Sequence, residues 1–272
     1  MKKVLEQSKD PKLLLLPKIN EYLLQHGGEK YTEKAMNQVW EALTTPGRDR
    51  RKSFSASSAG TCKRRQEFVY LGYPQKPVMP KQQVVFTIGH WLHAQTQAML
   101  LSADLIQDIE VPIALPQYNA KGSMDGQGFV WWEPANSKWA GQEFILEAKT
   151  VGARVWQDKV KKGKPSDDHL AQIHRYFAAT GIRLCSYLMI DKGNTGPEGL
   201  VEFVVEADDK LLDESFKELE ALKEAEDKQE LHPMLRLCTM KTGTDWRYCP
   251  FAGRDGVCLN THEWKAYGVD TD

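Results

Sequence analysis

A strand-like segment near the middle of the chain carries a carboxylate and a lysine two residues apart. Residues 143–150 read as a buried strand, and Glu147 and Lys149 stand near its end. Because side chains alternate along a strand, both project from the same face. Unpaired buried charges are costly, so the two residues form either a structural ion pair or part of a site that requires both charges.

A second carboxylate belongs to the preceding predicted strand. Asp125 lies in the segment 122–126, and antiparallel pairing of the two strands would bring it beside Glu147. Two neighbouring carboxylates repel each other unless a divalent cation lies between them, and a hard cation such as Mg²⁺ prefers oxygen ligands. Lys149 would then activate a water molecule or stabilise charge on a phosphate. The group predicts metal-dependent chemistry at a phosphate.

Two predicted helices flank these strands and carry further polar side chains. His93 lies on the helix before the strands and offers a nitrogen ligand, although a single helical histidine is more often structural. Gln172 and Tyr176, four residues apart on the helix that follows, share one helical face. Two interpretations of this pair are open: the side chains pack against the core, or they contact a substrate.

The five cysteines divide into two groups. Cys185 lies in the apolar run 184–190 and is interpreted as a buried core residue, whereas the other four stand beside Gly, Pro, Arg and Lys. An odd number of cysteines without an export signal argues against a disulfide framework. Four thiolates ligate a zinc ion or a [4Fe–4S] cluster in proteins, and unligated thiols are the remaining alternative. This second group comprises Cys62, Cys238, Cys249 and Cys258.

The spacing of apolar residues predicts the elements that position these side chains. Helical spacing runs through residues 1–45, 84–101, 169–180 and 209–230, and strand-like segments cover 105–115, 122–132, 143–150, 184–190 and 200–205. Asp208 is the expected N-cap of the last helix. A serine between residues 53 and 58 is the expected N-cap of the helix that carries Cys62. This order of helix, three strands, helix and two strands predicts an α/β fold.

The same residues, taken in order, resemble the PD-(D/E)XK nuclease superfamily and most closely its RecB-type branch. That pattern has a histidine on the upstream helix, then Gly-x-x-Asp, an acid-x-Lys and a Gln-x-x-x-Tyr helix. All four parts are matched here, by His93, Asp125, Glu147-x-Lys149 and Gln172-x-x-x-Tyr176. The resemblance implies a restriction-endonuclease-like core, in which a central mixed β-sheet is flanked by helices.

The resemblance also implies roles for these residues. His93, Asp125, Glu147 and the backbone carbonyl of Ala148 would hold Mg²⁺ or Mn²⁺, and Lys149 would assist the attacking water. Gln172 and Tyr176 would position the DNA strand. The implied activity is that of an exonuclease that hydrolyses phosphodiester bonds at single-stranded DNA ends.

One cysteine before the core and three after it resemble the iron–sulfur branch of RecB-like nucleases, which includes CRISPR-associated exonucleases and AddB-type repair nucleases. By this resemblance Cys62, Cys238, Cys249 and Cys258 would bind a structural [4Fe–4S] cluster that clasps the N- and C-terminal parts together. The family usually spaces its last three cysteines more tightly. Here ten residues separate Cys238 from Cys249 and eight separate Cys249 from Cys258, which keeps Zn²⁺ as the alternative.

Composition limits the function classes. The chain has 272 residues, with 36 Lys and Arg against 37 Asp and Glu, so its net charge of −1 does not indicate nucleic-acid binding. Basic residues nevertheless gather at 48–52, 63–65 and 159–164. The runs 48–52 and 159–164 would track phosphates, with Trp156 or Tyr176 available to stack on bases. No apolar run approaches the ~20 residues of a membrane helix, and no secretory signal is present. We therefore expect a cytoplasmic protein without membrane contact.

We expect one compact unit with a helical region at 1–52, the nuclease core at 53–231 and the cysteine-bearing segment at 232–272. The sequence has no Gly-x-x-x-x-Gly-Lys phosphate loop, so unwinding would require a helicase or recombination partner. Repair, recombination, viral genome processing and CRISPR adaptation are all compatible pathways. One rival hypothesis is a non-catalytic single-stranded nucleic-acid-binding module with structural zinc, which predicts a broken acid-x-Lys. The other is a zinc-stabilised interaction protein.

Overall fold

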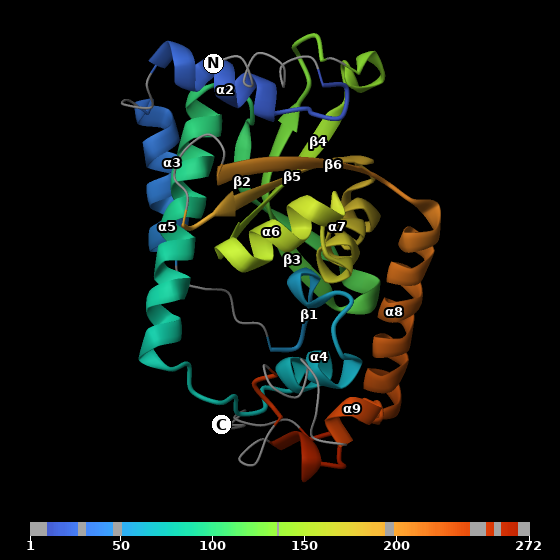
Figure 1. The fold of residues 1–272 in the computed structure, drawn as a ribbon. Helices are drawn as coiled ribbons and strands as arrows, with labels where there is room; N and C mark the ends of the chain where they lie inside the picture. The colour runs from blue at the N-terminus through green and yellow to red at the C-terminus, as the bar shows by residue number, and fades with distance from the viewer. Residues whose placement is uncertain are drawn as a thin grey trace.

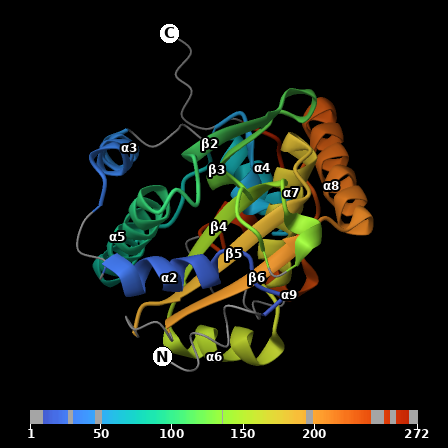
Figure 2. The same cartoon turned by 90° about the horizontal axis from the view of Figure 1, so that it is seen from above.

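The computed structural model describes residues 10–26, 31–45, 51–134, 136–193, 199–239, 249–252 and 257–265. A mixed β-sheet lies between two layers of helices (Figures 1 and 2). Its strands are β1 (Phe54–Ser55), β2 (Asp108–Leu115), β3 (Ala120–Phe129), β4 (Glu143–Val151), β5 (Leu184–Asp191) and β6 (Leu200–Glu206). The predicted α/β fold with a central mixed sheet flanked by helices is confirmed.

The sheet order is β1-β3-β4-β5-β6, and β2 also pairs with β3. The β2/β3, β3/β4 and β5/β6 pairs are antiparallel, whereas β1/β3 and β4/β5 are parallel. A parallel pair requires a crossover connection, which two helices provide between β4 and β5. These are α6 (Ala153–Lys162) and α7 (Asp167–Thr180).

Each face of the sheet has its own apolar core. One core includes Phe144 and Leu146 of β4 and lies under three helices, whereas the other includes Ile145 and lies under two (Figure 2). Strand alternation therefore directs Glu147 toward the second layer. The first layer comprises α2 (Leu16–His26), α3 (Glu33–Thr44) and α5 (Pro80–Ser102), and the second comprises α7 and α8 (Asp209–Lys228).

A buried carboxylate fixes the N-terminal helical region to the sheet. Glu202 of β6 is 4% exposed and accepts hydrogen bonds from the backbone N–H groups of Leu14, Leu15 and Leu16. These N–H groups precede or begin α2, where a helix leaves donors without internal partners and favours negative charge. The Ser186 hydroxyl also donates to Glu202, so this carboxylate is satisfied by protein groups alone.

At the other end of the molecule, α4 (Lys63–Tyr70) packs against the C-terminal segment, which includes α9 (Arg236–Thr239) (Figure 1). The rings of Phe68 and Phe251 lie 5.3 Å apart, between centroids, in an apolar cluster that also contains Cys258. Among the described residues, no helix combines the length and apolar character needed to span a membrane.

Several local expectations are confirmed and others are wrong. The Asp208 side chain caps α8, accepting from the N–H groups of Lys210 and Leu211 as expected. The expected serine cap is wrong, because Cys62 itself occupies the N-cap of α4 and makes no side-chain capping bond. Helix α6 was missed, since none of its residues is buried and its lysines read as a solvated charge run.

Candidate active site

The β3/β4 ladder stops where the predicted acidic residues begin. Its register ends at the pair Gly126–Leu146, so that Asp125 and Glu147 stand opposite each other one step beyond it. There the Asp125 Oδ2 atom accepts a hydrogen bond from the Ala148 N–H at 2.7 Å. The antiparallel pairing expected from the sequence is confirmed. A side chain, rather than the backbone of β3, satisfies this N–H of β4.

One of the two opposed carboxylates is fully buried and the other, Asp125, is half-buried. Glu147 is fully buried, and within the described residues neither of its carboxylate oxygens has a hydrogen-bond partner of good geometry, although Lys149 forms an ion pair with it. Burial, reinforced by Asp125, raises the pKa of Glu147 to about 7. Burial likewise raises the pKa of Asp125 to about 6, against the attraction of Lys149. Such a pair is well suited to a bound cation.

Lys149 supplies the positive charge of this group. Burial alone would lower the pKa of its ammonium, but Glu147 and Asp125 raise it above the ordinary value. The ammonium therefore stays protonated at neutral pH. A protonated lysine stabilises negative charge at a phosphate, whereas it cannot accept a proton from water. Of the two roles considered from the sequence, the protonated state of Lys149 in the metal-free protein favours charge stabilisation.

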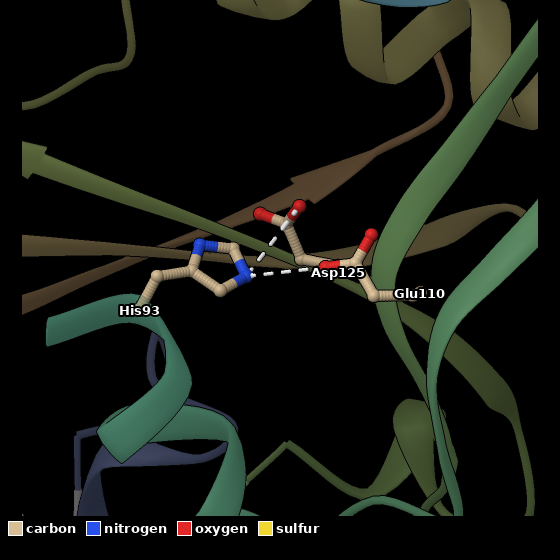
Figure 3. Close-up of side chains that lie close together, drawn as sticks. All are labelled: His93, Glu110 and Asp125. Atoms are coloured by element: carbon tan, nitrogen blue, oxygen red, sulfur yellow. Dashed lines mark ion pairs between the residues drawn. The ribbon is translucent and has the colours of Figure 1, made fainter. Parts of the chain in front are cut away.

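Helix α5 brings His93 to the carboxylates. Its Nε2 atom lies 3.8 Å from Asp125 Oδ1 and 3.7 Å from Oε1 of Glu110, and has no hydrogen-bond partner among the described residues (Figure 3). Burial lowers the pKa of His93, despite the opposing effect of Glu110. Neutral imidazole is the form that binds metals. One ligand atom from each of these three residues lies within 4.8 Å of the others.

Glu110 is the site residue that sequence reasoning missed. It lies on β2 between residues paired with Gly126 and Met124, which places it across from Asp125. Its φ of 49° is unusual for a non-glycine residue, and such conformations persist where surrounding contacts impose them. The side chains of Gln97 and Ser123 donate to its two carboxylate oxygens. A single acid in a loosely alternating strand gave no signal of this position.

Helix α7 places Gln172 and Tyr176 behind Glu147. The Gln172 side-chain amide donates to the Tyr176 hydroxyl, and Glu147 contributes to a Tyr176 pKa well above the ordinary value, for which burial is the main cause. Both residues line the cleft described below, yet Tyr176 is only 1% exposed. Its ring is therefore not available for base stacking, which corrects that expectation. Trp156 packs against the same core.

A cleft of about 1140 Å³ opens onto these residues. Its floor contains Asp125, Lys149, Gln172 and Tyr176, and one wall is the last two turns of α3. Serine hydroxyls from the segment around β1 line another side, at positions 53, 55 and 57. The N-terminal helical region, whose role the sequence did not indicate, thus forms part of the wall of the candidate active site.

The four predicted cluster cysteines line one small cavity between α4 and the C-terminal segment. The cavity measures about 20 Å³ and is lined by Cys62, Cys238, Cys249 and Cys258. No three of their sulfur atoms, all within the described residues, lie within 4.8 Å of one another. A single tetrahedral Zn²⁺ holds sulfurs roughly 3.8 Å apart, given Zn–S bonds of about 2.3 Å. The thiols share a cavity without the compact grouping of a zinc site.

Other contacts join the same two parts of the chain. Arg64 of α4 donates to the backbone carbonyls of His232 and Thr261, and Glu67 accepts from the backbone and ring of His232. Burial raises the pKa of Cys258, and Arg64 opposes this effect. Cys185 is fully buried in the core, as expected, and none of the five cysteines, all of them described, forms a disulfide.

Comparisons with known proteins reveal distant structural similarity. No protein-family model matches the chain, and no curated protein matches it by sequence. A crystal structure of LHK-Exo in complex with dAMP is similar at a TM-score of 0.49 and 20% identity, covering 66% of this chain and 91% of that one. A crystal structure of the alkaline exonuclease LHK-Exo from Laribacter hongkongensis is similar at a TM-score of 0.48 and 19% identity, and it covers the same shares of the two chains.

A crystal structure of SSO0001 is similar at a TM-score of 0.44 and 15% identity, covering 80% of this chain and 91% of that one. All three similarities are remote.

Proposed function

We propose that this chain is a divalent-metal-dependent DNA nuclease of the PD-(D/E)XK type, most closely of the RecB-type branch. The observation that carries the proposal is the opposition of Asp125 and Glu147 at the end of the β3/β4 ladder, with Lys149 beside them. Two opposed carboxylates with raised pKa values, one fully buried and one half-buried, destabilise the metal-free protein, and a bound cation relieves that cost.

The donor set fits Mg²⁺ or Mn²⁺. His93, Asp125 and Glu110, whose ligand atoms lie within 4.8 Å of one another, would hold the ion (Figure 3). Glu147 and the Ala148 carbonyl would complete the set, as the resemblance implies. Carboxylate and carbonyl oxygens suit these hard cations, and an imidazole is compatible with Mn²⁺. When bound, the ion supplies a Lewis acid that activates water and polarises the scissile phosphate.

The protein groups around this ion have separate tasks. Lys149 stays protonated and stabilises the charge that grows on the phosphate in the transition state. The Ala148 N–H fixes the orientation of the Asp125 carboxylate through its hydrogen bond. Gln172 and Tyr176, packed behind Glu147, hold that carboxylate in place, and Gln172 borders the cleft where the strand would lie.

The substrate we propose is a single-stranded DNA end, hydrolysed by exonuclease action. The resemblance of the ordered motif residues supports this assignment, and α3 forms one wall of the cleft in which the strand would lie. A helicase or recombination partner would supply single strands. The basic residues of α6 would contact phosphates, whereas most of the basic run 48–52 lies outside the described residues.

We further propose that the four-cysteine cavity binds a structural [4Fe–4S] cluster, with Zn²⁺ as the alternative. Support comes from the cavity that all four thiols line and from the resemblance of their order in the sequence to that of iron–sulfur RecB-like nucleases. The cluster would join α4 to the C-terminal segment, adding to the contacts of Arg64 and Glu67. A metal bound in this way contributes to folding free energy.

The decisive experiment is digestion of single-stranded and duplex DNA, labelled at either end, with Mg²⁺ or Mn²⁺. EDTA and a Lys149→Ala protein are the controls. Metal-dependent loss of the single strand, absent in the variant, would establish the enzyme, and the label position would give its polarity. Binding without cleavage by protein with an intact cysteine site would instead favour the non-catalytic nucleic-acid-binding module.

A further inference from the structure

Exposed apolar side chains are concentrated in the first half of α5. Five large ones lie within eight residues, and no residue from 80 to 88 is buried. The exposed fractions are 60% for Val84, 44% for Val85, 48% for Phe86, 47% for Ile88 and 61% for Trp91. A helix that is apolar on several sides normally has those sides covered, so this segment requires an occupant.

Helical spacing separates these side chains into two faces. Phe86, His90 and His93 follow at steps of four and three residues and therefore share one face, which continues to Gln97. His93 and Gln97 both contact the acidic site, so this face points toward it. Phe86 lies two turns before His93, roughly 10 Å along the helix axis.

The second face is formed by three apolar residues on the opposite side of the helix. Their spacing of four and three residues places them about half a turn from His93. They are Val84, Ile88 and Trp91. This outer face provides an internal control, since it belongs to the same exposed segment but points away from the acidic site.

Contacts at the middle of α5 hold its exposed half beside the strand ends. A Cβ at Gly89 would lie 3.0 Å from the Oγ1 atom of Thr150, the residue that directly follows Lys149 in β4. The Lys192 ammonium, after β5, donates to the Val85 carbonyl at 3.3 Å. A bulkier residue at position 89 would require the Thr150 side chain to shift. The segment before Gly89 extends past the strand ends (Figure 1), and Lys192 lies beside it.

We propose that the Phe86–His90 face of α5 is a stacking platform for the bases of an unpaired nucleic-acid strand whose backbone reaches the His93–Asp125 site. Exposed aromatic rings next to lysines are the combination that binds single strands without sequence preference. Continuity with the acidic site favours this occupant over a protein, because Phe86 and His90 share one face of α5 with His93, which lies at that site. The inference rests on the proposed function for the location of the scissile phosphate.

The test measures binding in EDTA, where no cleavage occurs. Fluorescence anisotropy of a labelled oligothymidylate is compared for wild type, Phe86→Ala and Trp91→Ala, each as the full chain. We expect Phe86→Ala to weaken binding about tenfold and Trp91→Ala to leave it unchanged. Phe86→Leu retains the apolar bulk without a ring and should resemble Phe86→Ala, whereas Phe86→Tyr should restore binding.

An abasic strand of the same length separates stacking from a general structural effect. Wild type and Phe86→Ala should bind the abasic strand equally, because it has phosphates but no bases. Equal losses on both strands, or no loss with Phe86→Leu, would overturn the platform. A change in oligomeric state with Trp91→Ala and unaltered DNA binding by every variant would identify a protein-docking face instead.

The outcome is independent of the cleavage assay. Base-dependent binding that needs Phe86 supports the platform even if the chain cuts no DNA. Cleavage by a protein whose binding ignores Phe86 overturns the platform and leaves the nuclease intact.

Discussion

The Asp125 carboxylate accepts a hydrogen bond from the Ala148 N–H at 2.7 Å, one residue past the end of the β3/β4 ladder. A single side chain thus satisfies the backbone of β4 and faces the Glu147 carboxylate. Three potential ligands, His93, Glu110 and Asp125, offer atoms within 4.8 Å of one another because α5, β2 and β3 converge at this point. Glu147 and the Ala148 carbonyl are the further ligands we propose.

Asp125→Asn separates the hydrogen bond from the charge. The asparagine oxygen can still accept from the Ala148 N–H, but one of the two opposed charges is removed. We expect metal-dependent cleavage to be lost, while the metal-free protein becomes more stable by about 1 kcal/mol. Thermal unfolding in EDTA beside a cleavage assay checks this. A destabilised Asp125→Asn protein would contradict the opposition of the two carboxylates.

The raised carboxylate pKa values predict how stability depends on pH. The pKa of Asp125 is raised from 3.8 to about 6 and the pKa of Glu147 from 4.5 to about 7. Between the unfolded and folded pKa values, the folded protein therefore binds more protons than the unfolded chain. In EDTA, the stabilisation from these groups should be complete below pH 4 and decline until about pH 7. Urea unfolding across this range should show the decline, and Mg²⁺ should reduce it. An unchanged slope with Mg²⁺ would contradict metal binding here.

Lys149→Ala removes the partner of a fully buried carboxylate. Cleavage should fall by about a hundredfold to a thousandfold, because charge on the phosphate loses its stabiliser. In EDTA the variant should also lose roughly 2 kcal/mol of folding free energy, since Glu147 is left uncompensated. Added Mg²⁺ should restore part of that stability but not the activity. Full activity in the variant would exclude the assigned role.

Glu110→Gln tests the ligand that sequence reasoning missed. Isothermal titration with Mn²⁺ should show affinity reduced by about tenfold or more, because one charged oxygen donor is lost. Asp108→Asn is the matched control, since Asp108 lies two residues earlier on β2 and borders the same cleft outside the ligand group. Equal effects of the two substitutions would indicate general electrostatics instead of ligation.

Cys249→Ser tests the cysteine cavity. Protein purified without oxygen should lose its thiolate-to-iron absorption, and its thermal stability should fall, because the cluster joins α4 to the C-terminal segment. Cys185→Ala is the control, as this thiol lies in the core away from the cavity. Its iron content should match wild type. Unchanged thermal stability of Cys249→Ser would refute a structural role, and zinc without iron would favour the alternative metal.

Periodicity and short motifs were sufficient for much of the architecture. The alternation in β4 placed Glu147 and Lys149 on one face, and four-residue spacing paired Gln172 with Tyr176, because local geometry alone determines these relations. Helix α6 escaped detection because it buries no residue, and its pattern is that of a solvated charge run. Local patterns thus identified the strands and the main charged residues.

The convergence of distant segments was decided by the tertiary structure. Glu110 carries no distinguishing neighbours in sequence, and its place across from Asp125 follows from the β2/β3 register and a backbone φ of 49°. Tyr176 appeared available for stacking until packing against the core buried it. The exposure of the Phe86 face is likewise decided by the tertiary structure, because the first half of α5 extends past the strand ends. Sequence spacing determines which residues share a face, whereas burial and long-range pairing determine what that face meets.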